Sequence, residues 1–230
     1  MRTGLLLPIF QDDARRALDA ARRAEDAGVD GVFCYDHVWP MGQPGRPALA
    51  PFPVLSLVAT RTERVAVGPL VARVGLVPDR VLLGQFAALR AIAPGRVIAA
   101  MGTGDRLSAG ENEAYGVEFE VAARRRARLA RCVRSALDMG LVTWVGDGSA
   151  STRRIAADEG AALNLWDATV ADVRDEARRA EVTWAGPVTG PLAPAVGRLA
   201  GAGATWAVFA WPVDVDELAA AGRAASSGGA

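Results

Sequence analysis

The chain has 230 residues, 51% of them hydrophobic, and its 26 acidic and 26 basic side chains leave no formal net charge. This composition excludes an intrinsically disordered protein, and the charge balance argues against electrostatic capture of nucleic acid or of an anionic membrane. All of the basic residues are arginine, which excludes enzymes that depend on a lysine Schiff base or a lysine nucleophile.

The first half of the chain alternates apolar runs of strand length with helical patterns. In chain order we expect a strand at 3–10, a helix at 12–27, a strand at 31–35, a helix at 54–60, a strand at 64–74, a helix at 80–92 and a strand at 96–101. Asp12 and Asp13 are predicted to cap the first helix, and Gly28 to end it. The first strands are continuously apolar, which is typical of parallel strands buried on both faces.

The second half continues the alternation after a polar loop at 102–116. We expect an arginine-rich helix at 121–139, followed by a strand at 141–145, a helix at 151–159, a strand at 161–166, a helix at 170–180, a strand at 182–185, a helix at 193–200, a strand at 205–211 and a last helix from Asp214. The arginine-rich helix is interpreted as a solvated or subunit-facing surface, and a homodimer is compatible with it. Residues 226–230 are expected to fray.

About eight strand–helix units in one uninterrupted run predict a parallel sheet with right-handed crossovers. For a chain of this length, the count favours a compact α/β protein with a closed (β/α)8 TIM barrel. An open doubly wound sheet is the alternative. No composition shift marks a linker, so residues 1–225 are predicted to form a single domain.

The two cysteines, Cys34 and Cys132, stand alone, without a CxxC motif or a metal-ligand spacing. This usage indicates a reducing, cytoplasmic environment and no metal site. The apolar start of the chain leads straight into acidic residues without a cleavage signal, so we interpret it as a first strand. No segment stays apolar for the roughly 20 residues that a membrane span needs.

The most informative segment is 28–40, because it contains the only histidine. Asp36 and His37 follow directly after the apolar strand at 31–35. Parallel α/β proteins keep their chemistry at the C-terminal ends of strands, and an unperturbed imidazole titrates near neutral pH. Either this pair is catalytic, or His37 merely forms a hydrogen bond with the adjacent loop.

In a barrel, the loops that follow the other strands would meet this pair on one face. Gly102, Thr103, Gly104 and Asp105 form such a loop, and its glycines would let a flat ligand come close to the backbone, although a tight strand-to-loop turn is the simpler explanation. Solvation of the loop is the simplest explanation for the acidic run of Asp105, Glu111 and Glu113. Trp144, Trp166, Trp184 and Trp211 stand near strand ends, where they would line a pocket or pack in the core.

The segment 144–152, WVGDGSAST, has glycines after a strand and hydroxyl residues that open a helix. A helix N-terminus offers unpaired N–H groups and partial positive charge, which suits a phosphate. Arg153 and Arg154 would add charge. The alternatives are an ordinary loop in which Ser151 caps the helix, and a phosphate site at 186–191, after the seventh strand.

Taken in order, these segments resemble the luciferase-like family of flavin- and deazaflavin-dependent oxidoreductases over nearly the whole chain. The segments that carry the resemblance are ARRAEDAGVDGVFCYDHV (21–38), ATRTERVAVGPLV (59–71), VPDRVLLGQFAALRAIAPGRVIAAMGTGD (77–105), ENEAYGVEFEVAARRRARLA (111–130) and VTWVGDGSASTRRIAADEGAALNLW (142–166). The resemblance implies a barrel that binds FMN or a deazaflavin, coenzyme F420, at its C-terminal mouth. It implies hydride transfer between that cofactor and a small organic substrate.

The resemblance also assigns residues. Asp36 and His37 match the catalytic or substrate-side pair. His37 would donate or accept a proton, and Asp36 would orient the imidazole of His37. The positions that match cofactor contacts are Val71 and Ala72, at a bulge behind the ring that often contains a non-prolyl cis peptide; Gly102, Thr103, Gly104 and Asp105, along the cofactor; and Gly146, Gly148 and Ser149, at its phosphate.

The chain departs from this family between the helix after the fourth strand and the fifth strand. Full-length members usually carry a long insertion there, whereas residues 136–141 are all that is present here. Because that insertion commonly helps to cover the site, a degenerate, non-catalytic barrel that binds a ligand or partner is the alternative function. A barrel isomerase or aldolase without a redox cofactor is a third interpretation.

Overall fold

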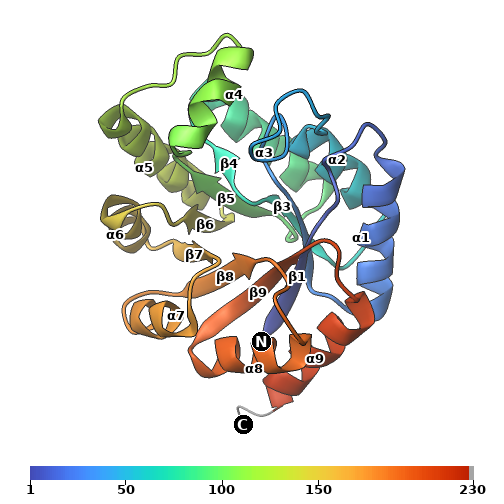
Figure 1. Cartoon of the computed structure of the whole chain (residues 1–230). Helices are drawn as coiled ribbons and strands as arrows, with labels where there is room; N and C mark the ends of the chain where they lie inside the picture. The colour runs from blue at the N-terminus through green and yellow to red at the C-terminus, as the bar shows by residue number, and fades with distance from the viewer. Residues whose placement is uncertain (228–230) are drawn as a thin grey trace.

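A computed structural model describes residues 1–227 and shows a ring of parallel strands surrounded by helices (Figure 1). The strands are β1 (Arg2–Leu6), β2 (Gly31–Cys34), β3 (Ala66–Pro69), β4 (Ala72–Arg73), β5 (Ile98–Gly102), β6 (Val142–Gly146), β7 (Ala162–Trp166), β8 (Val182–Gly186) and β9 (Ala204–Ala210). Their order in the sheet is β3-β2-β1-β9-β8-β7-β6-β5-β4, and every recorded pairing is parallel.

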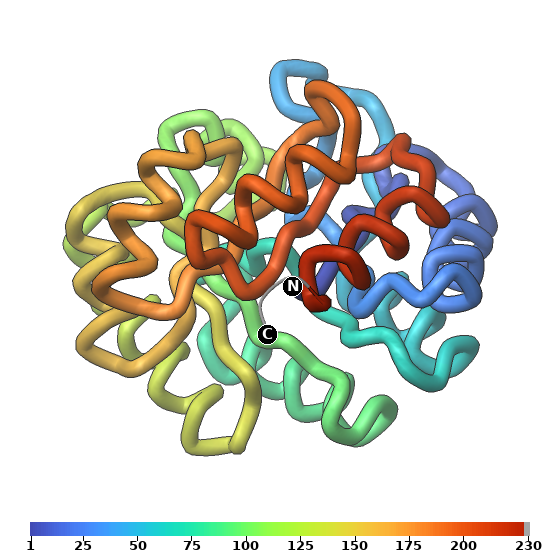
Figure 2. The backbone as a smooth tube through the Cα atoms, turned by 90° about the horizontal axis from the view of Figure 1, so that it is seen from below, coloured from blue at the N-terminus to red at the C-terminus, as the bar shows by residue number. Residues whose placement is uncertain are grey.

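The helices lie outside the ring, and Figure 2 shows them around the circumference with the N-terminus near the centre. They are α1 (Arg15–Ala27), α2 (Pro51–Ala59), α3 (Asp79–Ile92), α4 (Ala109–Ala114), α5 (Ala122–Asp138), α6 (Ala150–Glu159), α7 (Val170–Ala177), α8 (Leu192–Gly201) and α9 (Val215–Ser227), with a 3-10 turn η1 (Arg106–Ser108) before α4. None of the helices in residues 1–227 is both long enough and apolar enough to cross a membrane.

The strand predicted at 64–74 is two strands that share one place in the ring. A cis peptide between Leu70 and Val71 separates β3, which pairs with β2, from β4, which pairs with β5. A single parallel bridge between Val67 and Val97 joins β3 to the chain just before β5. The ring therefore has eight places, which confirms the (β/α)8 barrel and excludes the open sheet.

Two layers of apolar side chains hold the barrel together. The larger layer lies between the strands and the helices, and a smaller cluster fills the inside of the ring. Within this cluster Phe33 stacks on Trp144 at a centroid distance of 5.4 Å, and Trp206 packs edge-on against both rings. These rings fill the interior of the barrel below its mouth.

Several predicted boundaries differ from the structure, and the end of the first strand differs most. The first strand ends at Leu6, and α1 begins only at Arg15, whose N–H donates to Asp13 Oδ1 at 2.9 Å. The structure is helical through Ser227, and residues 228–230 of the tail that is predicted to fray lie outside the described residues.

Glu25 gives the fold a pH dependence that can be tested. Its carboxylate, buried on α1, accepts hydrogen bonds from the backbone N–H groups of Glu63, Arg64 and Val65 at 2.6–3.2 Å, which fixes the loop before β3. Burial alone would raise the pKa of Glu25, but these three donors outweigh it and lower the pKa below its ordinary 4.5. Folding therefore stabilises the ionised form.

Glu25→Gln is expected to lower the unfolding free energy by about 1–3 kcal/mol at pH 7, because the amide accepts these donors less strongly. The pKa of Glu25 is lower in the folded protein than in the unfolded chain. The difference in unfolding free energy between the variant and the wild type is therefore complete above the ordinary pKa, and it disappears as the pH falls through the pKa of the folded protein. Urea unfolding at a series of pH values measures it. Glu63→Gln, an exposed control, should show no such loss, and a pH-independent difference for Glu25→Gln would contradict the account.

Candidate functional site

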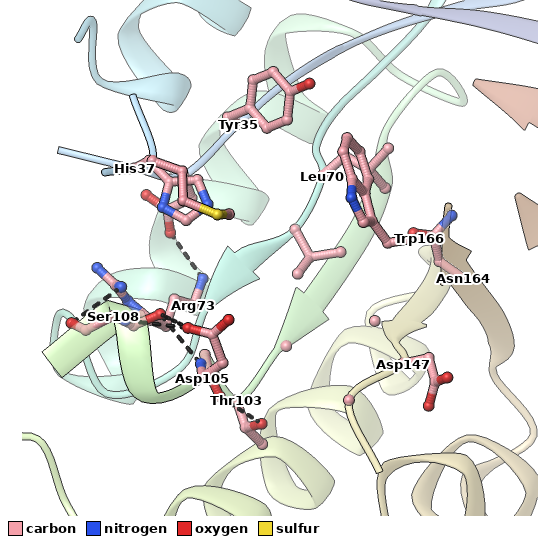
Figure 3. Close-up of a pocket in the computed structure, with 17 residues that line it drawn as sticks. Tyr35, His37, Leu70, Arg73, Thr103, Asp105, Ser108, Asp147, Asn164 and Trp166 are labelled. Atoms are coloured by element: carbon pink, nitrogen blue, oxygen red, sulfur yellow. Dashed lines mark hydrogen bonds between the residues drawn. The ribbon is translucent and has the colours of Figure 1, made fainter. Parts of the chain in front are cut away.

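A cavity of about 270 Å³ opens at the C-terminal ends of the strands (Figure 3). It is lined at five neighbouring places of the ring by Tyr35, Asp36 and His37 after β2; by Leu70, Val71 and Arg73 around the break between β3 and β4; by Gly102, Thr103, Gly104 and Asp105 at the end of β5; by Gly146, Asp147 and Gly148 at the end of β6; and by Asn164 and Trp166 in β7. The barrel thus brings most of the predicted site residues together.

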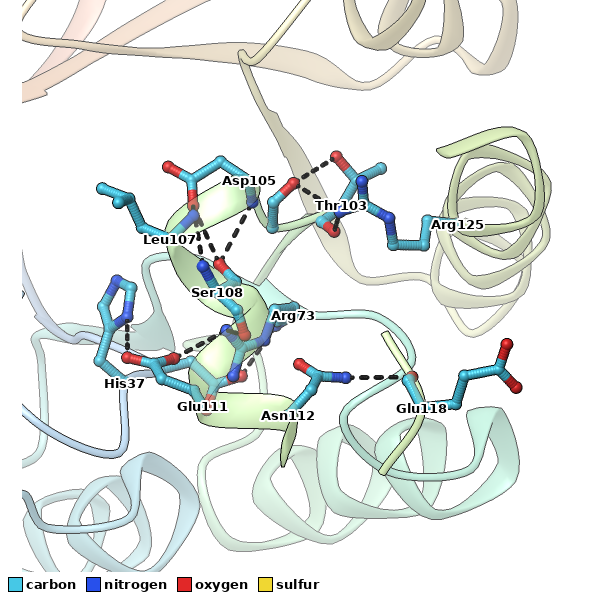
Figure 4. A network of polar contacts seen from close by, with 12 residues as sticks. His37, Arg73, Thr103, Asp105, Leu107, Ser108, Glu111, Asn112, Glu118 and Arg125 are labelled. Carbon is cyan, nitrogen blue, oxygen red and sulfur yellow. Dashed lines mark hydrogen bonds and ion pairs between the residues drawn. The ribbon is translucent and has the colours of Figure 1, made fainter. Parts of the chain in front are cut away.

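His37 is held by a carboxylate that lies 74 residues away in the sequence. Its Nδ1 lies 2.9 Å from Glu111 Oε1, on the short helix α4 above the mouth (Figure 4). The other oxygen of Glu111 accepts a hydrogen bond from Arg73 Nη1 at 2.7 Å. Glu111 and Arg73 are buried, whereas 30% of the His37 side chain remains exposed in the cavity. A carboxylate therefore links the imidazole to a buried cation.

This arrangement fixes the chemistry of the imidazole. A carboxylate oxygen can only accept, so the partner geometry assigns a proton to His37 Nδ1. In the neutral ring, Nε2 then carries the lone pair and can accept a proton. Glu111 also stabilises the imidazolium that such a transfer would form, and Arg73 supplies the positive charge that balances Glu111. His37 is equipped as a general base, or in the reverse direction as a general acid.

Asp36 has a different task from the one predicted. Its Oδ2 accepts a hydrogen bond from the Arg73 backbone N–H at 2.7 Å, which ties β2 to β4. Among the described residues, the ring nitrogen of His37 is hydrogen-bonded to Glu111 and not to Asp36, so Glu111 orients the imidazole. Burial raises the pKa of Asp36, and the Arg73 N–H partly opposes the rise. Asp36 lines the cavity beside His37.

The apolar side chain of Val71 forms part of the wall of the cavity. It follows the cis peptide, and its side chain lies against two glycines on neighbouring strands. A Cβ at Gly102 would come within 2.7 Å of Val71 Cγ2, and one at Gly146 within 3.1 Å. Ala72, the other residue predicted for this bulge, is buried in the outer core and does not line the cavity. The two glycines therefore make room for Val71 and leave the wall around it free of side chains.

The loop after β5 is held by its own side chains and by α5. Asp105 Oδ1 accepts from the N–H groups of Leu107 and Ser108 at 2.9 and 3.1 Å, which starts the turn η1. Arg125 donates to the carbonyls of Thr103 and Gly104 at 2.8 and 2.9 Å. This arginine is thus part of the scaffold of the site, contrary to the expectation of a purely solvated helix face.

The loop after β6 begins α6 with Ser149 as its N-cap, so the prediction of Ser151 as the cap is wrong. Gly148 lines the cavity, and a Cβ there would meet no atom within 4 Å. Ser149 does not line it. Arg153, predicted to add charge for a phosphate, is instead paired with two carboxylates of the chain itself.

The four tryptophans near strand ends do not form one pocket. Trp166 lies at the mouth, is 48% exposed and packs edge-on against Tyr35 at a centroid distance of 5.9 Å. Trp144 is enclosed inside the barrel, and Trp184 donates its Nε1–H to the Ala168 carbonyl. Trp211 packs against the outer core.

The sequence alone does not indicate two residues of this network. Loop solvation is enough to explain Glu111, and Arg73 lies inside a run that predicts only a strand. The signal available for Glu111 was its place in the polar loop after the fourth strand, which a barrel brings to the mouth. Within residues 1–227, no group of three or more His, Cys, Asp or Glu residues could hold a metal ion.

Comparisons with known proteins agree with this geometry. A family model described as luciferase-like monooxygenase matches residues 1–160. No curated protein matches the sequence significantly.

Solved structures of the same fold cover both chains almost completely. An F420-dependent secondary alcohol dehydrogenase in complex with an F420-acetone adduct superposes with a TM-score of 0.81 at 14% identity, over 97% of this chain and 98% of that chain. A coenzyme F420-dependent tetrahydromethanopterin reductase from Methanopyrus kandleri gives 0.73 at 13% identity, over 96% of each chain. The monooxygenase RslO1 from Streptomyces bottropensis gives 0.69 at 13% identity, over 97% of each chain. With its sequence matched over residues 1–160 and its barrel shared with these proteins, the chain belongs to the luciferase-like monooxygenase family.

Proposed function

We propose that this protein is an oxidoreductase that transfers a hydride between a flavin-type cofactor, FMN or coenzyme F420, and a small organic substrate. The observation that carries the proposal is a single cavity that has an apolar wall and a titratable side chain facing it. Val71 and its flanking glycines form a smooth apolar surface, and the ion-paired imidazole of His37 faces the same space. Family membership and the F420-dependent proteins of the same fold support it.

The residues present suit a flat tricyclic ring. Gly102 and Gly146 carry no side chain that would prevent a ring from lying on Val71, and a Cβ at either position would push against Val71. Asn164 and Trp166 extend the same side of the cavity with an amide and a large aromatic surface. When bound, a flavin-type ring supplies the hydride donor or acceptor, which no side chain of the protein provides.

The side chains of the protein would manage the proton that accompanies the hydride. For a substrate hydroxyl, His37 Nε2 would accept the O–H proton, and the bound flavin-type cofactor would supply the acceptor for the C–H hydride, so that a carbonyl is left. In the reverse direction, His37 returns the proton to the carbonyl oxygen. Glu111 keeps the imidazole in the required orientation, and Arg73 keeps Glu111 paired in its buried position.

Gly148→Arg is expected to weaken binding of the cofactor by at least about tenfold. The new side chain enters the cavity from a position with free space around it, so the fold should tolerate it. Fluorescence titration of the purified protein with FMN and with coenzyme F420 measures the effect, and we expect the wild type to bind one of them with a Kd on the order of micromolar.

Two further glycines give this titration its controls. Gly197→Arg, on the exposed side of α8, also has free space and should leave binding unchanged. Gly190→Arg tests the competing phosphate site at 186–191. If Gly190→Arg abolishes binding and Gly148→Arg does not, the orientation proposed for the cofactor is wrong.

A degenerate barrel that binds a ligand or a partner without catalysis is the second candidate. It is favoured by the short connection between α5 and β6, where only residues 139–141 separate the helix from the strand and leave no place for the long insertion that the resemblance implies. Failure of both FMN and coenzyme F420 to bind at millimolar concentration would select this candidate over the enzyme.

A further inference from the structure

We propose that Asp147 is a specificity-determining residue. It makes the cavity bind a flavin-type ligand through its ring, so that a phosphate group on the ligand adds little to the affinity. The inference rests on the proposed function, because it assumes that a flavin-type ring occupies the cavity. It concerns the end of the cavity farther from His37 in Figure 3, where Asp147 lies on the loop between β6 and α6.

Asp147 brings a carboxylate to the place where the resemblance expects a phosphate. It lines the cavity between Gly146 and Gly148, and its side chain is 17% exposed. Its backbone N–H donates to the Asn164 carbonyl at 2.8 Å, which fixes the residue against the middle of β7. A phosphate entering this end would therefore approach a fixed negative charge.

The cation next to this carboxylate is already paired with carboxylates of the protein. Arg153 Nε and Nη2 donate to the two oxygens of Asp147 at 3.1 and 2.7 Å, and Nη1 donates to Glu176 Oε1 at 2.8 Å. All three nitrogens of this guanidinium thus have carboxylate partners within the protein. A phosphate that used a remaining N–H group on Nη1 or Nη2 would lie beside the negative charges of Asp147 and Glu176.

The loop amides are also largely occupied. The N–H groups of Gly148 and Ser149 both donate to Thr152 Oγ1, at 3.1 and 3.0 Å, and the Thr152 N–H donates to Ser149 Oγ. Among the described residues, the recorded bonds leave only the amides of Ala150 and Ser151 free in this turn. The partial positive charge at the N-terminus of α6 is therefore offset by the Asp147 carboxylate. Most of the amide N–H groups there already donate to side chains of the same turn.

The test compares riboflavin with FMN, which differ only in the phosphate. We expect the wild type to bind both with Kd values within about threefold of each other. Asp147→Asn should tighten FMN by about tenfold and leave riboflavin within about twofold, because only the phosphorylated ligand meets the removed charge. The gain should shrink as salt is added, since salt screens exposed charges. Fluorescence titration gives all four constants without any assay of activity.

Glu176→Gln is the matched control. It removes one negative charge from the same ion-paired group, but residue 176 does not line the cavity. Arg153 then keeps Asp147 as its remaining carboxylate partner, so the ratio of the two Kd values should not change. Wild-type protein that binds FMN more than about thirtyfold tighter than riboflavin would overturn the inference and leave the proposed function standing. An unchanged ratio in Asp147→Asn would overturn it in the same way.

If neither flavin binds, the same comparison is made with coenzyme F420 and its phosphate-free deazaflavin ring, under the same criteria. Failure of all four ligands to bind overturns the proposed function, and the inference about Asp147 falls with it.

Discussion

Glu111→Gln is expected to lower the turnover number for hydride transfer by about 10²–10⁴-fold while changing the Kd of the cofactor by less than about threefold. The carboxylate accepts from His37 with one oxygen and from Arg73 with the other, and a glutamine has only one oxygen to offer. Its NH2 group must face one of these two donors. Either the imidazole loses the partner that assigns its proton, or a buried guanidinium loses its counterion.

The measurement is the rate at which bound cofactor is reduced or oxidised with a panel of small alcohols and ketones, followed by absorbance across a range of pH. Glu113→Gln is the matched control, since Glu113 lies on the same short helix but is exposed, and it should retain the wild-type rate. If Glu111→Gln kept both the rate and the pH profile of the wild type, Glu111 would not orient His37 for proton transfer.

Gly68→Ala is expected to lower the unfolding free energy by about 3 kcal/mol or more. Gly68 lies in β3 where the ring closes, and a Cβ there would come within 2.2 Å of the Ile98 backbone oxygen. A backbone atom of β5 cannot turn aside as a side chain can, so the two strands must separate. Because Val67 forms the bridge to Val97 next to this contact, the separation would open the barrel at its seam.

Urea unfolding followed by circular dichroism measures this effect. Gly84→Ala serves as the control because Gly84 is exposed in the middle of α3 with free space around it, and the change should stabilise the protein by about 0.4–1 kcal/mol. Equal stability of Gly68→Ala and the wild type would show that β3 and β5 are not in contact as described.

The fold could be predicted because its signals are local. The alternation of apolar runs with helical patterns indicated the number of units, and the turn glycine Gly28 marked a helix end that does adopt the left-handed conformation. The break between β3 and β4 left no local signal of this kind, and only the resemblance indicated it, through the bulge expected at Val71 and Ala72. An apolar run looks continuous in the sequence whether or not a cis peptide divides it, because the division depends on how β4 registers with β5.

The site could be predicted only in part for the same reason. A titratable pair directly after an apolar strand located Asp36 and His37 at the mouth, and glycines after two other strands located Gly102 and Gly146. Glu111 belongs to a helix of only six residues, too short for a periodic pattern to reveal which side it buries. Its burial comes from the distant partners His37 and Arg73. The self-pairing of Asp147 with Arg153 likewise emerges only once β6 and α6 are folded against each other.

The central claim is that a flavin-type ring lies on Val71 and faces the pair of His37 and Glu111. A crystal structure of the protein with bound FMN or coenzyme F420 tests it most directly. The account predicts that one face of the ring contacts the Val71 side chain between Gly102 and Gly146, with His37 Nδ1 still bonded to Glu111. A ring bound away from Val71, or a His37 turned away from Glu111 in the complex, would contradict it.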